Sequence, residues 1–256
     1  MKISTLLSLA GLAAAVVVPA AGRAAEDYPA PVKAIEAQGV EIIGRFSAPG
    51  GVTGYAAVVG QRPLAIYVTA DGKHAIVGTM VDSQGNDLTH EPLERLVKKP
   101  LTARTWKQLE GSTWIGDGSA KAPRVVYVFT DPNCPYCRKF WADARPWVEA
   151  GKVQLRHILV GILRPSSAGK AAAILADKQP EAALGRDERA GRQGGVEPMD
   201  PIPAKIRAQL DANEQLMQQL GSYATPTIFY KDDDGDLQSV QGAPQPQMLA
   251  GILGPR

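Results

Sequence analysis

The residues best suited to chemistry are two cysteines, the only two in a chain of 256 residues. Cys134 and Cys137 lie three positions apart in the segment TDPNCPYC, residues 130–137. The apolar run 125–129 precedes this segment as an expected strand, and 138–144 is expected to continue as a helix. A Cys-x-x-Cys pair at a strand-to-helix junction is typical of thiol–disulfide redox centres. The pair therefore predicts chemistry carried by two sulfur atoms, with no cofactor such as a metal, nucleotide or flavin.

Cys134 is the expected nucleophile, because it would lie at the N-terminus of that helix. Free backbone N–H groups and the helix dipole favour an anion at this position, and so favour a thiolate. Pro135 suits the first helical position, where its missing N–H goes unused. Cys137, one turn further along, is expected to be the less accessible, resolving thiol. Tyr136 is expected on the surface, where it can contact a substrate.

Two other uses of the pair fit the sequence less well. A disulfide between Cys134 and Cys137 would close a very short loop, and short loops gain the least stability from a cross-link. A closed zinc site needs four ligands. The histidines are His74, His90 and His157, and none has ligand spacing with the pair. We therefore expect neither a structural staple nor a metal site.

A second candidate element is the segment YATPT, residues 223–227. A proline at the start of a strand needs a reason, because it cannot donate to the sheet. Taken alone, Pro226 is expected to be trans, since only about 5% of X–Pro bonds are cis. Its place after a Cys-x-x-Cys domain instead favours a cis bond between Thr225 and Pro226 beside the thiols. That arrangement would present the Thr225 backbone to an extended substrate peptide.

Residues 1–24 are expected to be a signal peptide that is absent from the mature protein. Lys2 gives a positive start, 6–18 are uncharged and apolar, and 19–25 offer small residues for cleavage. The apolar stretch is shorter than the ~20 residues that a membrane span needs, although a retained anchor is the alternative interpretation. Export would place the thiols where disulfides can form and persist.

The charge balance argues against a nucleic-acid partner. The chain has 28 basic and 26 acidic residues, and without Lys2 and Arg23 it has 26 of each. No basic stripe of the kind that binds phosphate backbones is present. The mature protein is therefore expected to be nearly neutral and to bind no nucleic acid.

The mature chain is long enough for two domains. Residues 26–90 predict a compact α+β unit without catalytic residues, with a helix at 31–38 and strands at 40–46, 54–59, 64–69 and 74–80. Asp71 and Gly72 between the last two strands are a strong hairpin signal. About 60 residues is marginal for an independent core, which indicates a surface that a partner covers.

Residues 91–119 are expected to connect this unit to the next, with a helix that Pro100 interrupts. Residues 120–256 then predict a second domain that starts with a βαβ unit, so its strands 125–129 and 153–160 should be parallel. Further helices are expected at 168–176 and 204–220. The Gly-, Arg- and Pro-rich segment 185–203 between them is expected to be an exposed loop, and 181–197 a spacer. A hairpin and a short helix from residue 247 end the chain.

Several of these segments together resemble the family of periplasmic disulfide isomerases that includes DsbC and DsbG. The resemblance runs from about residue 29 to the C-terminus, and it is carried by 133–137, 140–141, 144–148, 151–156 and 225–226. The Cys-Pro-Tyr-Cys sequence and residues 29–36 are similar to the DsbG branch. One departure is Asn133, which stands where an aromatic residue is expected. This difference bears on the surface that contacts substrate and not on the chemistry of the cysteines.

The resemblance implies a V-shaped homodimer in the periplasm. Residues 26–90 would form a cystatin-like dimerisation domain, 91–119 a linker helix, and 120–256 a thioredoxin-like catalytic domain with a helical insertion. It implies that Cys134 attacks, that Cys137 resolves, and that Pro226 is cis. The implied partners are exported proteins with oxidised cysteines and the membrane reductase DsbD. The implied reactions are reduction of sulfenic acids and isomerisation of wrong disulfides.

Two other functions remain open from the sequence. One is a net disulfide oxidant of the DsbA kind, which Thr225 and the N-terminal domain disfavour, because DsbA proteins usually carry Val before the cis-proline and lack that domain. The other is a chaperone-like dimeric binding module whose redox activity is accessory.

Overall fold

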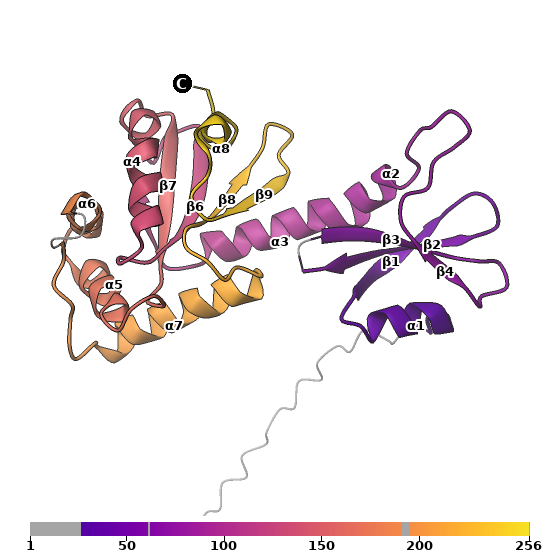
Figure 1. Ribbon diagram of the computed structural model, residues 1–256, viewed down its shortest axis with the longest axis horizontal. Helices are drawn as coiled ribbons and strands as arrows, with labels where there is room; N and C mark the ends of the chain where they lie inside the picture. The colour runs from indigo at the N-terminus through magenta and orange to yellow at the C-terminus, as the bar shows by residue number, and fades with distance from the viewer. Residues whose placement is uncertain (1–26, 61, 191–194, 256) are drawn as a thin grey trace, which may run out of the picture.

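The computed structural model describes residues 27–60, 62–190 and 195–255. The described chain forms two β-sheets joined by a long helical segment (Figure 1). One sheet has four strands in the order β1-β2-β3-β4, and the other has five in the order β5-β7-β6-β8-β9. Helices pack on both sheets, so the expected α+β class is confirmed. The expected signal peptide lies outside the described residues.

The first sheet is antiparallel throughout and has both faces covered. Its elements are α1 (Ala30–Glu36), β1 (Glu41–Ser47), β2 (Thr53–Val59), β3 (Arg62–Val68) and β4 (Ala75–Val77). On one face, Val32 of α1 packs against Ile42, Tyr55 and Ile66. On the other face, Phe46 and Tyr67 pack with Val97 of the connecting helix. The alternation of side chains along each strand places one set on each face.

The connecting segment is helical without a break. It comprises α2 (His90–Leu93), the wide π-type turn η1 (Glu94–Lys98) and α3 (Lys99–Glu110). The prediction that Pro100 interrupts the helix is therefore wrong. Proline lacks a donor and crowds the preceding turn. Here Pro100 lies in the first turn of α3, directly after the wider turn, and the helix continues past it.

The second sheet contains the expected parallel pair. Its elements are β5 (Trp114–Asp117), β6 (Arg124–Thr130), α4 (Pro135–Glu149), β7 (Val153–Leu159), β8 (Thr227–Lys231) and β9 (Leu237–Gln241). Strands β6 and β7 are parallel with α4 between them, which confirms the predicted βαβ unit. β5 lies within residues 91–119, the expected connector, but it pairs with β7 and so belongs to the second sheet.

Three helices are inserted between β7 and β8, namely α5 (Ser167–Ala176), α6 (Pro180–Ala190) and α7 (Ala204–Gln219). The prediction of a loop from residue 185 is wrong for its first six residues, which are the second half of α6. Glycine has a low helix propensity, but α6 packs against α4 and α5, and this tertiary contact overrides the local preference. The buried Ala183 and Leu184 anchor it.

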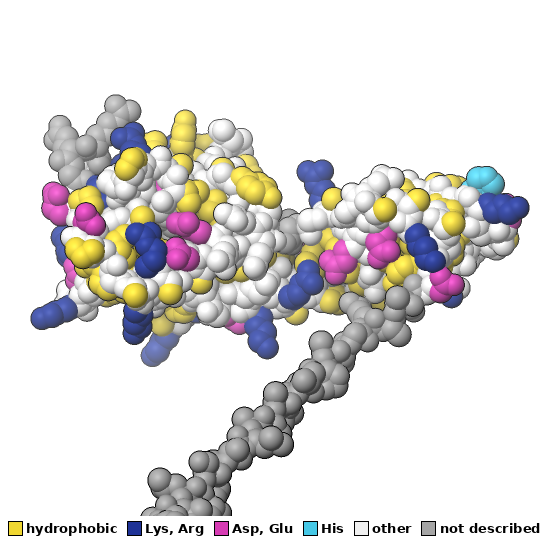
Figure 2. Space-filling view, turned by 90° about the horizontal axis from the view of Figure 1, so that it is seen from below, with side chains coloured by type: hydrophobic (Ala, Val, Ile, Leu, Met, Phe, Trp, Pro, Cys, Tyr) yellow, Lys and Arg dark blue, Asp and Glu magenta, His cyan; other side chains and the backbone are white. Residues whose placement is uncertain are grey.

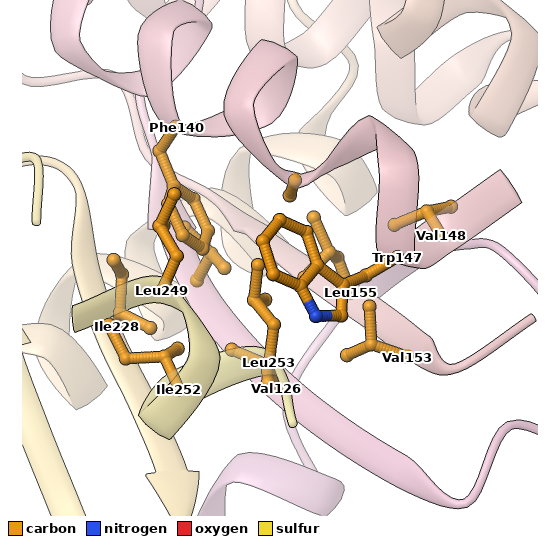
Figure 3. Packing of buried hydrophobic residues seen from close by; sticks show 12 residues of the cluster. Val126, Phe140, Trp147, Val148, Val153, Leu155, Ile228, Leu249, Ile252 and Leu253 are labelled. Carbon is orange, nitrogen blue, oxygen red and sulfur yellow. The ribbon is translucent and has the colours of Figure 1, made fainter. Parts of the chain in front are cut away.

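The core of the second unit is divided by its sheet. On one face, Phe140 and Trp147 of α4 pack with Val126, Ile228 and Leu253 (Figure 3). Leu253 belongs to the short terminal helix α8 (Leu249–Leu253), which follows the single turn η3 (Pro246–Met248). The indole N–H of Trp147 donates to the carbonyl of Gly254 at 2.8 Å.

The opposite face of the same sheet is covered by α3 and α7. Leu109 and Met217 of these helices pack on Tyr127, Phe129 and Phe229. The sheet is therefore buried on both faces, and α4 packs against one of these faces. The N-terminus of α4 consequently has a fixed place at the end of β6.

Candidate active site around Cys134 and Cys137

Cys134 occupies the N-cap position of α4. Its backbone is extended (φ −83°, ψ 114°), and Pro135 follows at the first helical position. The Cys134 sulfur accepts a hydrogen bond from the backbone N–H of Cys137 at 3.3 Å. This is one of the donors that a helix start leaves without an intrahelical partner. The structure thus places the sulfur at the expected end of the helix.

The surroundings of Cys134 favour its thiolate. They lower its pKa from 9.0 to about 6. The largest cause is a hydrogen bond from the Cys137 thiol, which burial opposes, and the Thr225 hydroxyl and the backbone N–H groups of Cys137 and Tyr136 add to it. Donors to the charged form lower a pKa in this way. At neutral pH Cys134 is therefore mostly a thiolate.

Cys137 has the opposite tendency. Burial raises its pKa well above 9.0, and the neighbouring Cys134 adds to this effect. Each cysteine is only 2% exposed at the surface. Desolvation is nevertheless the largest cause at Cys137 and not at Cys134, so Cys137 is the more deeply buried thiol, as expected. The two thiols also differ in ionisation. That difference suits a nucleophile at 134 and a thiol at 137 that stays protonated until it is needed.

The segment with Pro226 lies directly against Cys134. The Thr225–Pro226 peptide bond is cis. In its thiol form, the Cys134 sulfur donates to the Thr225 carbonyl at 3.2 Å. The Thr225 hydroxyl is buried and has no hydrogen-bond partner in the described part of the chain, so it is available to the thiolate. Residues 134 and 225, distant in sequence, thus share one site.

Asp131 fixes the loop before Cys134, and sequence reasoning missed it. Its buried carboxylate accepts hydrogen bonds from the backbone N–H groups of Asn133, Ile162 and Leu163 at 2.8, 2.8 and 2.9 Å. It also accepts one from the Ser167 hydroxyl at 2.8 Å. This carboxylate therefore ties the end of β6 to the segment after β7. An aspartate at the carboxyl end of a parallel strand, two residues before a possible turn partner, was the available signal.

Asn133 also has a positioning contact. Its side-chain amide donates to the hydroxyls of Ser166 and Ser167, both at 3.0 Å. The side chain is only half-buried, but it is directed to the start of α5. Asn133 thus joins the loop before α4 to the start of α5.

Exposed apolar residues occur in three segments that hydrogen bonds join near Cys134, namely the start of α4, the segment before Thr225 and the segment after β7. Tyr136 is 61% exposed, as expected from the sequence, and Pro135 is exposed beside it. Tyr223 is 78% exposed, and Ile162 and Leu163 are also exposed. We call these five residues the apolar rim. Sequence reasoning missed the last three, because nothing in their local pattern distinguishes them from residues of ordinary loops.

A group of buried and partly buried charged side chains joins α4, α5 and α6. Asp187 and Glu188 of α6 are buried, although this segment was expected to be a spacer. Arg138 of α4 and Lys170 of α5 face Asp187 at 3.8 and 3.6 Å. Sequence reasoning did not identify this group, because its members come from three helices.

Other kinds of site find no support within the described ranges. These residues contain no group of three or more His, Cys, Asp or Glu side chains placed to hold a metal ion. No helix among residues 27–60, 62–190 and 195–255 is long and apolar enough to cross a membrane. On the face drawn in Figure 2, basic and acidic side chains are interspersed rather than gathered into a basic stripe.

Two family descriptions match the chain. Residues 21–90 match the N-terminal domain of disulfide bond isomerase proteins, and residues 118–254 match a thioredoxin-like domain. The thiol:disulfide interchange protein DsbG of Pseudomonas aeruginosa is 51% identical over 256 residues, which cover 100% of both chains. DsbG of Escherichia coli K12 is 44% identical over 234 residues, covering 90% of this chain and 93% of that protein.

Similarity to DsbC is lower. A probable DsbC of Bordetella avium is 27% identical over 168 residues, covering 65% of this chain and 55% of that protein. The two-domain match and the full-length identity agree with the fold of two units, each built on one sheet. The chain therefore belongs to the DsbC/DsbG family of thiol:disulfide interchange proteins, as a DsbG-like thiol–disulfide oxidoreductase.

Proposed function

We propose that Cys134 and Cys137 are the catalytic pair and that they reduce oxidised cysteines in exported proteins. The observation that carries this proposal is the opposite ionisation of the two thiols, with the pKa of Cys134 lowered to about 6 and that of Cys137 raised. The thiolate is the form of cysteine that attacks a disulfide sulfur. Cys134 is thus present as the nucleophilic thiolate, while Cys137 stays a protonated thiol.

The first step forms a mixed disulfide. The Cys134 thiolate attacks one sulfur of a client disulfide, a bond forms between these two sulfurs, and the client's other sulfur leaves as a thiolate with the bonding electrons. On a sulfenic acid, the same attack forms the same bond and expels hydroxide, which leaves as water after protonation. In either case the client sulfur has entered a disulfide with Cys134.

The second step releases the client. Cys137 loses its proton and attacks the Cys134 sulfur, and the client sulfur departs with the electron pair as a thiolate. The client has then gained two electrons, and the enzyme holds a Cys134–Cys137 disulfide. Another turnover needs a dithiol reductant. By family resemblance this is the membrane reductase DsbD, and neither step needs a further cofactor.

We assign substrate contact to Pro135, Tyr136, Thr225 and Pro226. Pro135 and Tyr136 are exposed at the start of α4, whereas Thr225 and Pro226 are buried and Tyr223, just before them in the chain, is exposed. A client peptide would therefore contact the apolar rim with its side chains. It would meet the Thr225 backbone only at the edge of the Cys134 site. Exposed apolar residues gathered around a nucleophile support this use.

We place the protein in the periplasm as a homodimer, with 26–90 as the dimerisation domain, 91–119 as the linker and 120–256 as the catalytic domain. The edge strand β4 supports the dimer. Ile76 and Val77 of this strand and the nearby Val81 are exposed. An edge strand with unpaired backbone groups and exposed apolar side chains is suited to pair with a second chain.

The experiment is to trap the mixed disulfide. Full-length mature protein carrying Cys137→Ala is mixed with a client peptide that contains one sulfenylated or disulfide-bonded cysteine. A covalent adduct should accumulate, and Cys134→Ala should give none. If Cys134→Ala protected clients from oxidation and misfolding as well as the wild type does, the redox proposal would be overturned in favour of a binding module.

The redox state in cells separates reduction from net oxidation. Rapid acid trapping followed by alkylation should find the wild-type pair mostly reduced. A pair found mostly oxidised at steady state would contradict the proposed direction of electron flow and would support an oxidant of the DsbA kind.

A further inference from the structure

The two edges of the five-stranded sheet differ in what covers them. Strand β5 forms one edge, and helix α6 packs against it. Strand β9 forms the other edge, on the side of the sheet nearest the first unit (Figure 1). Unpaired edge strands can pair with other chains, so folded proteins usually cover or shorten them. An edge left open beside a reactive site is therefore a candidate for binding.

The hydrogen bonds at the two ends of β9 show which of its backbone groups face outward. At one end the N–H of Gly242 donates to the carbonyl of Pro226 at 2.7 Å, and at the other the N–H of Asp232 donates to the carbonyl of Asp236 at 3.0 Å. Opposed residues of an antiparallel pair alternate between hydrogen-bonded and non-hydrogen-bonded pairs. The even-numbered positions of β9 therefore face β8. The odd-numbered positions direct their N–H and carbonyl groups away from the sheet.

Three positions of β9 have this outward direction, and the first is covered. The backbone N–H of Leu237 donates to the hydroxyl of Thr102 of α3 at 3.2 Å. Ser239 and Gln241 are exposed, and their backbone groups make no such bond to another part of the described chain. We call the backbone of these two residues the open edge. It offers two N–H donors and two carbonyl acceptors in the spacing of a β-strand.

The open edge lines a cavity of about 760 Å³. The other walls come from α3, from the segment after α7, and from the end of β2 and the start of β3. Binding sites in proteins usually measure roughly 300–1,000 Å³. The lining mixes apolar residues such as Leu101 with polar ones such as Ser222, and it has charges of both signs, as in Arg62 and Asp236. This mixture suits a peptide of mixed sequence better than a wholly apolar or strongly charged ligand.

The segment before β8 connects this cavity to the cysteine site. The side-chain amide of Gln241 donates to the carbonyl of Gly221 at 3.2 Å and accepts from the N–H of Tyr223 at 3.4 Å. Ser222 of this segment lines the cavity, and the carbonyl of Thr225 lies 3.2 Å from the Cys134 sulfur. At most three Cα–Cα steps of about 3.8 Å separate Thr225 from Ser222, so roughly five extended residues span the way from Cys134 to the cavity.

We propose that the open edge binds an extended segment of the client as an added β-strand while the client cysteine reacts at Cys134. This inference rests on the function proposed above, and it assigns a place to the chain that flanks the client cysteine. Recognition is through backbone N–H and carbonyl groups, which chains of any sequence present, so the edge accepts different clients. Folded proteins have already paired most of these groups, so the edge selects unfolded segments.

The test compares a short and a long client in the full mature protein. The short client is a peptide of about five residues whose central cysteine carries a disulfide-linked dye, and the long client has about six more residues at each end, enough to reach the cavity. In the wild type, kcat/KM should be about tenfold higher for the long client, mainly through KM, because several backbone hydrogen bonds are added. In Ser239→Pro this ratio should fall to about 1, since proline removes an outward N–H but no bond to β8.

The matched control is Ser239→Ala, which keeps both backbone groups and should keep the wild-type ratio. A wild-type ratio in Ser239→Pro would overturn the inference. So would a ratio lost equally in Ser239→Ala, because the side chain would then make the contact. A smaller oligomer of Ser239→Pro in sedimentation would show that a second copy of this chain occupies the edge, which also overturns it. If neither client formed a mixed disulfide with the wild type, the proposed function would fail instead.

A second measurement needs no variant and no reaction. Amide-resolved hydrogen exchange by NMR follows Ser239 and Gln241 of the wild type with and without a saturating long peptide whose cysteine is replaced by alanine. Both amides should exchange at least about fivefold more slowly with the peptide, because they become hydrogen-bonded. N-methylation of alternate peptide residues should abolish this protection in one register and keep it in the other, since a strand pairs through alternate residues. Unchanged exchange at both amides would overturn the inference.

Discussion

The start of α4 and the buried half of α6 both supply groups with shifted pKa values, but for different reasons. At the start of α4, the groups that lower the pKa of Cys134 are mostly within three residues of it, and the helix itself positions them. In α6, burial by other elements is the largest cause that raises the pKa of Glu188. The first site is a property of a local segment, and the second exists only after several helices have packed. Substitutions can therefore test the local site at the start of α4 and the packed site in α6 separately.

The largest expected effect concerns α6 and the pH dependence of stability. Because the pKa of Glu188 rises from 4.5 to about 8 on folding, the native state binds more protons between these values. Wild-type stability contributed by this group therefore falls as pH rises from below 4.5 to 8. Reduced Glu188→Gln lacks this titration. The difference in free energy of unfolding, variant minus wild type, should therefore increase by up to roughly 4 kcal/mol between pH 4.5 and pH 8.

Urea unfolding of both reduced proteins at several pH values measures this difference. If the difference in free energy of unfolding between the two proteins stayed constant from pH 4 to pH 8, burial would not raise the pKa of Glu188.

The next effect tests how far the α4 site is local. Asp131 lies only three residues before Cys134, yet its carboxylate accepts hydrogen bonds from the loop after β7 and from α5. In Asp131→Asn, the amide nitrogen would face donors on one side. We expect a loss of about 3 kcal/mol in the free energy of unfolding, because buried donors lose their acceptor.

Chemical denaturation measures the loss, and Asp211→Asn, an exposed change on α7, is the matched control. The pKa of Cys134 in folded Asp131→Asn should move little, since its nearest donors remain. A large rise in that pKa would mean that the α4 site depends on tertiary contacts as much as the α6 site does.

A smaller effect concerns the donors to the Cys134 thiolate. The ultraviolet absorbance of the thiolate should titrate with a midpoint at about pH 6 in the wild type. Cys137→Ala removes the largest favourable donor, and Thr225→Val removes another. Each should raise the midpoint by about 1 or less, because loss of a hydrogen bond to the charged form favours the thiol. A midpoint near that of free cysteine in the wild type would contradict the local origin of the shift.

The smallest effect is expected on the apolar rim. Tyr223→Ser removes an exposed ring that packs in no buried cluster, so stability should change by less than about 0.5 kcal/mol. The KM for an unfolded client should rise a few-fold while kcat is kept. Lys139→Ser on the exposed side of α4 is a suitable control. An unchanged KM would exclude Tyr223 from client contact.

Much of the fold was accessible from the sequence because its signals are local. The alternating strands of the first sheet, the βαβ unit and the final hairpin follow from side-chain periodicity and from turn residues. The continuity of the connecting helix could not be predicted from the sequence. Pro100 is a helix breaker by local rules, but it is tolerated here because it follows a wider turn. The helical path of residues 185–190 was missed for a related reason, since packing against α4 and α5 outweighs the low propensity of Gly185.

The sequence by itself determined the chemistry of the pair. Two cysteines three apart at a strand-to-helix junction place one sulfur at free backbone N–H groups, and no other element is needed for that. Tertiary structure decided what surrounds the pair. Asp131, Tyr223 and Glu188 come from three separate parts of the chain, and their burial or exposure depends on elements that meet only when the domain packs. A hydrogen bond within one helix turn is encoded locally, whereas desolvation is a property of the whole fold.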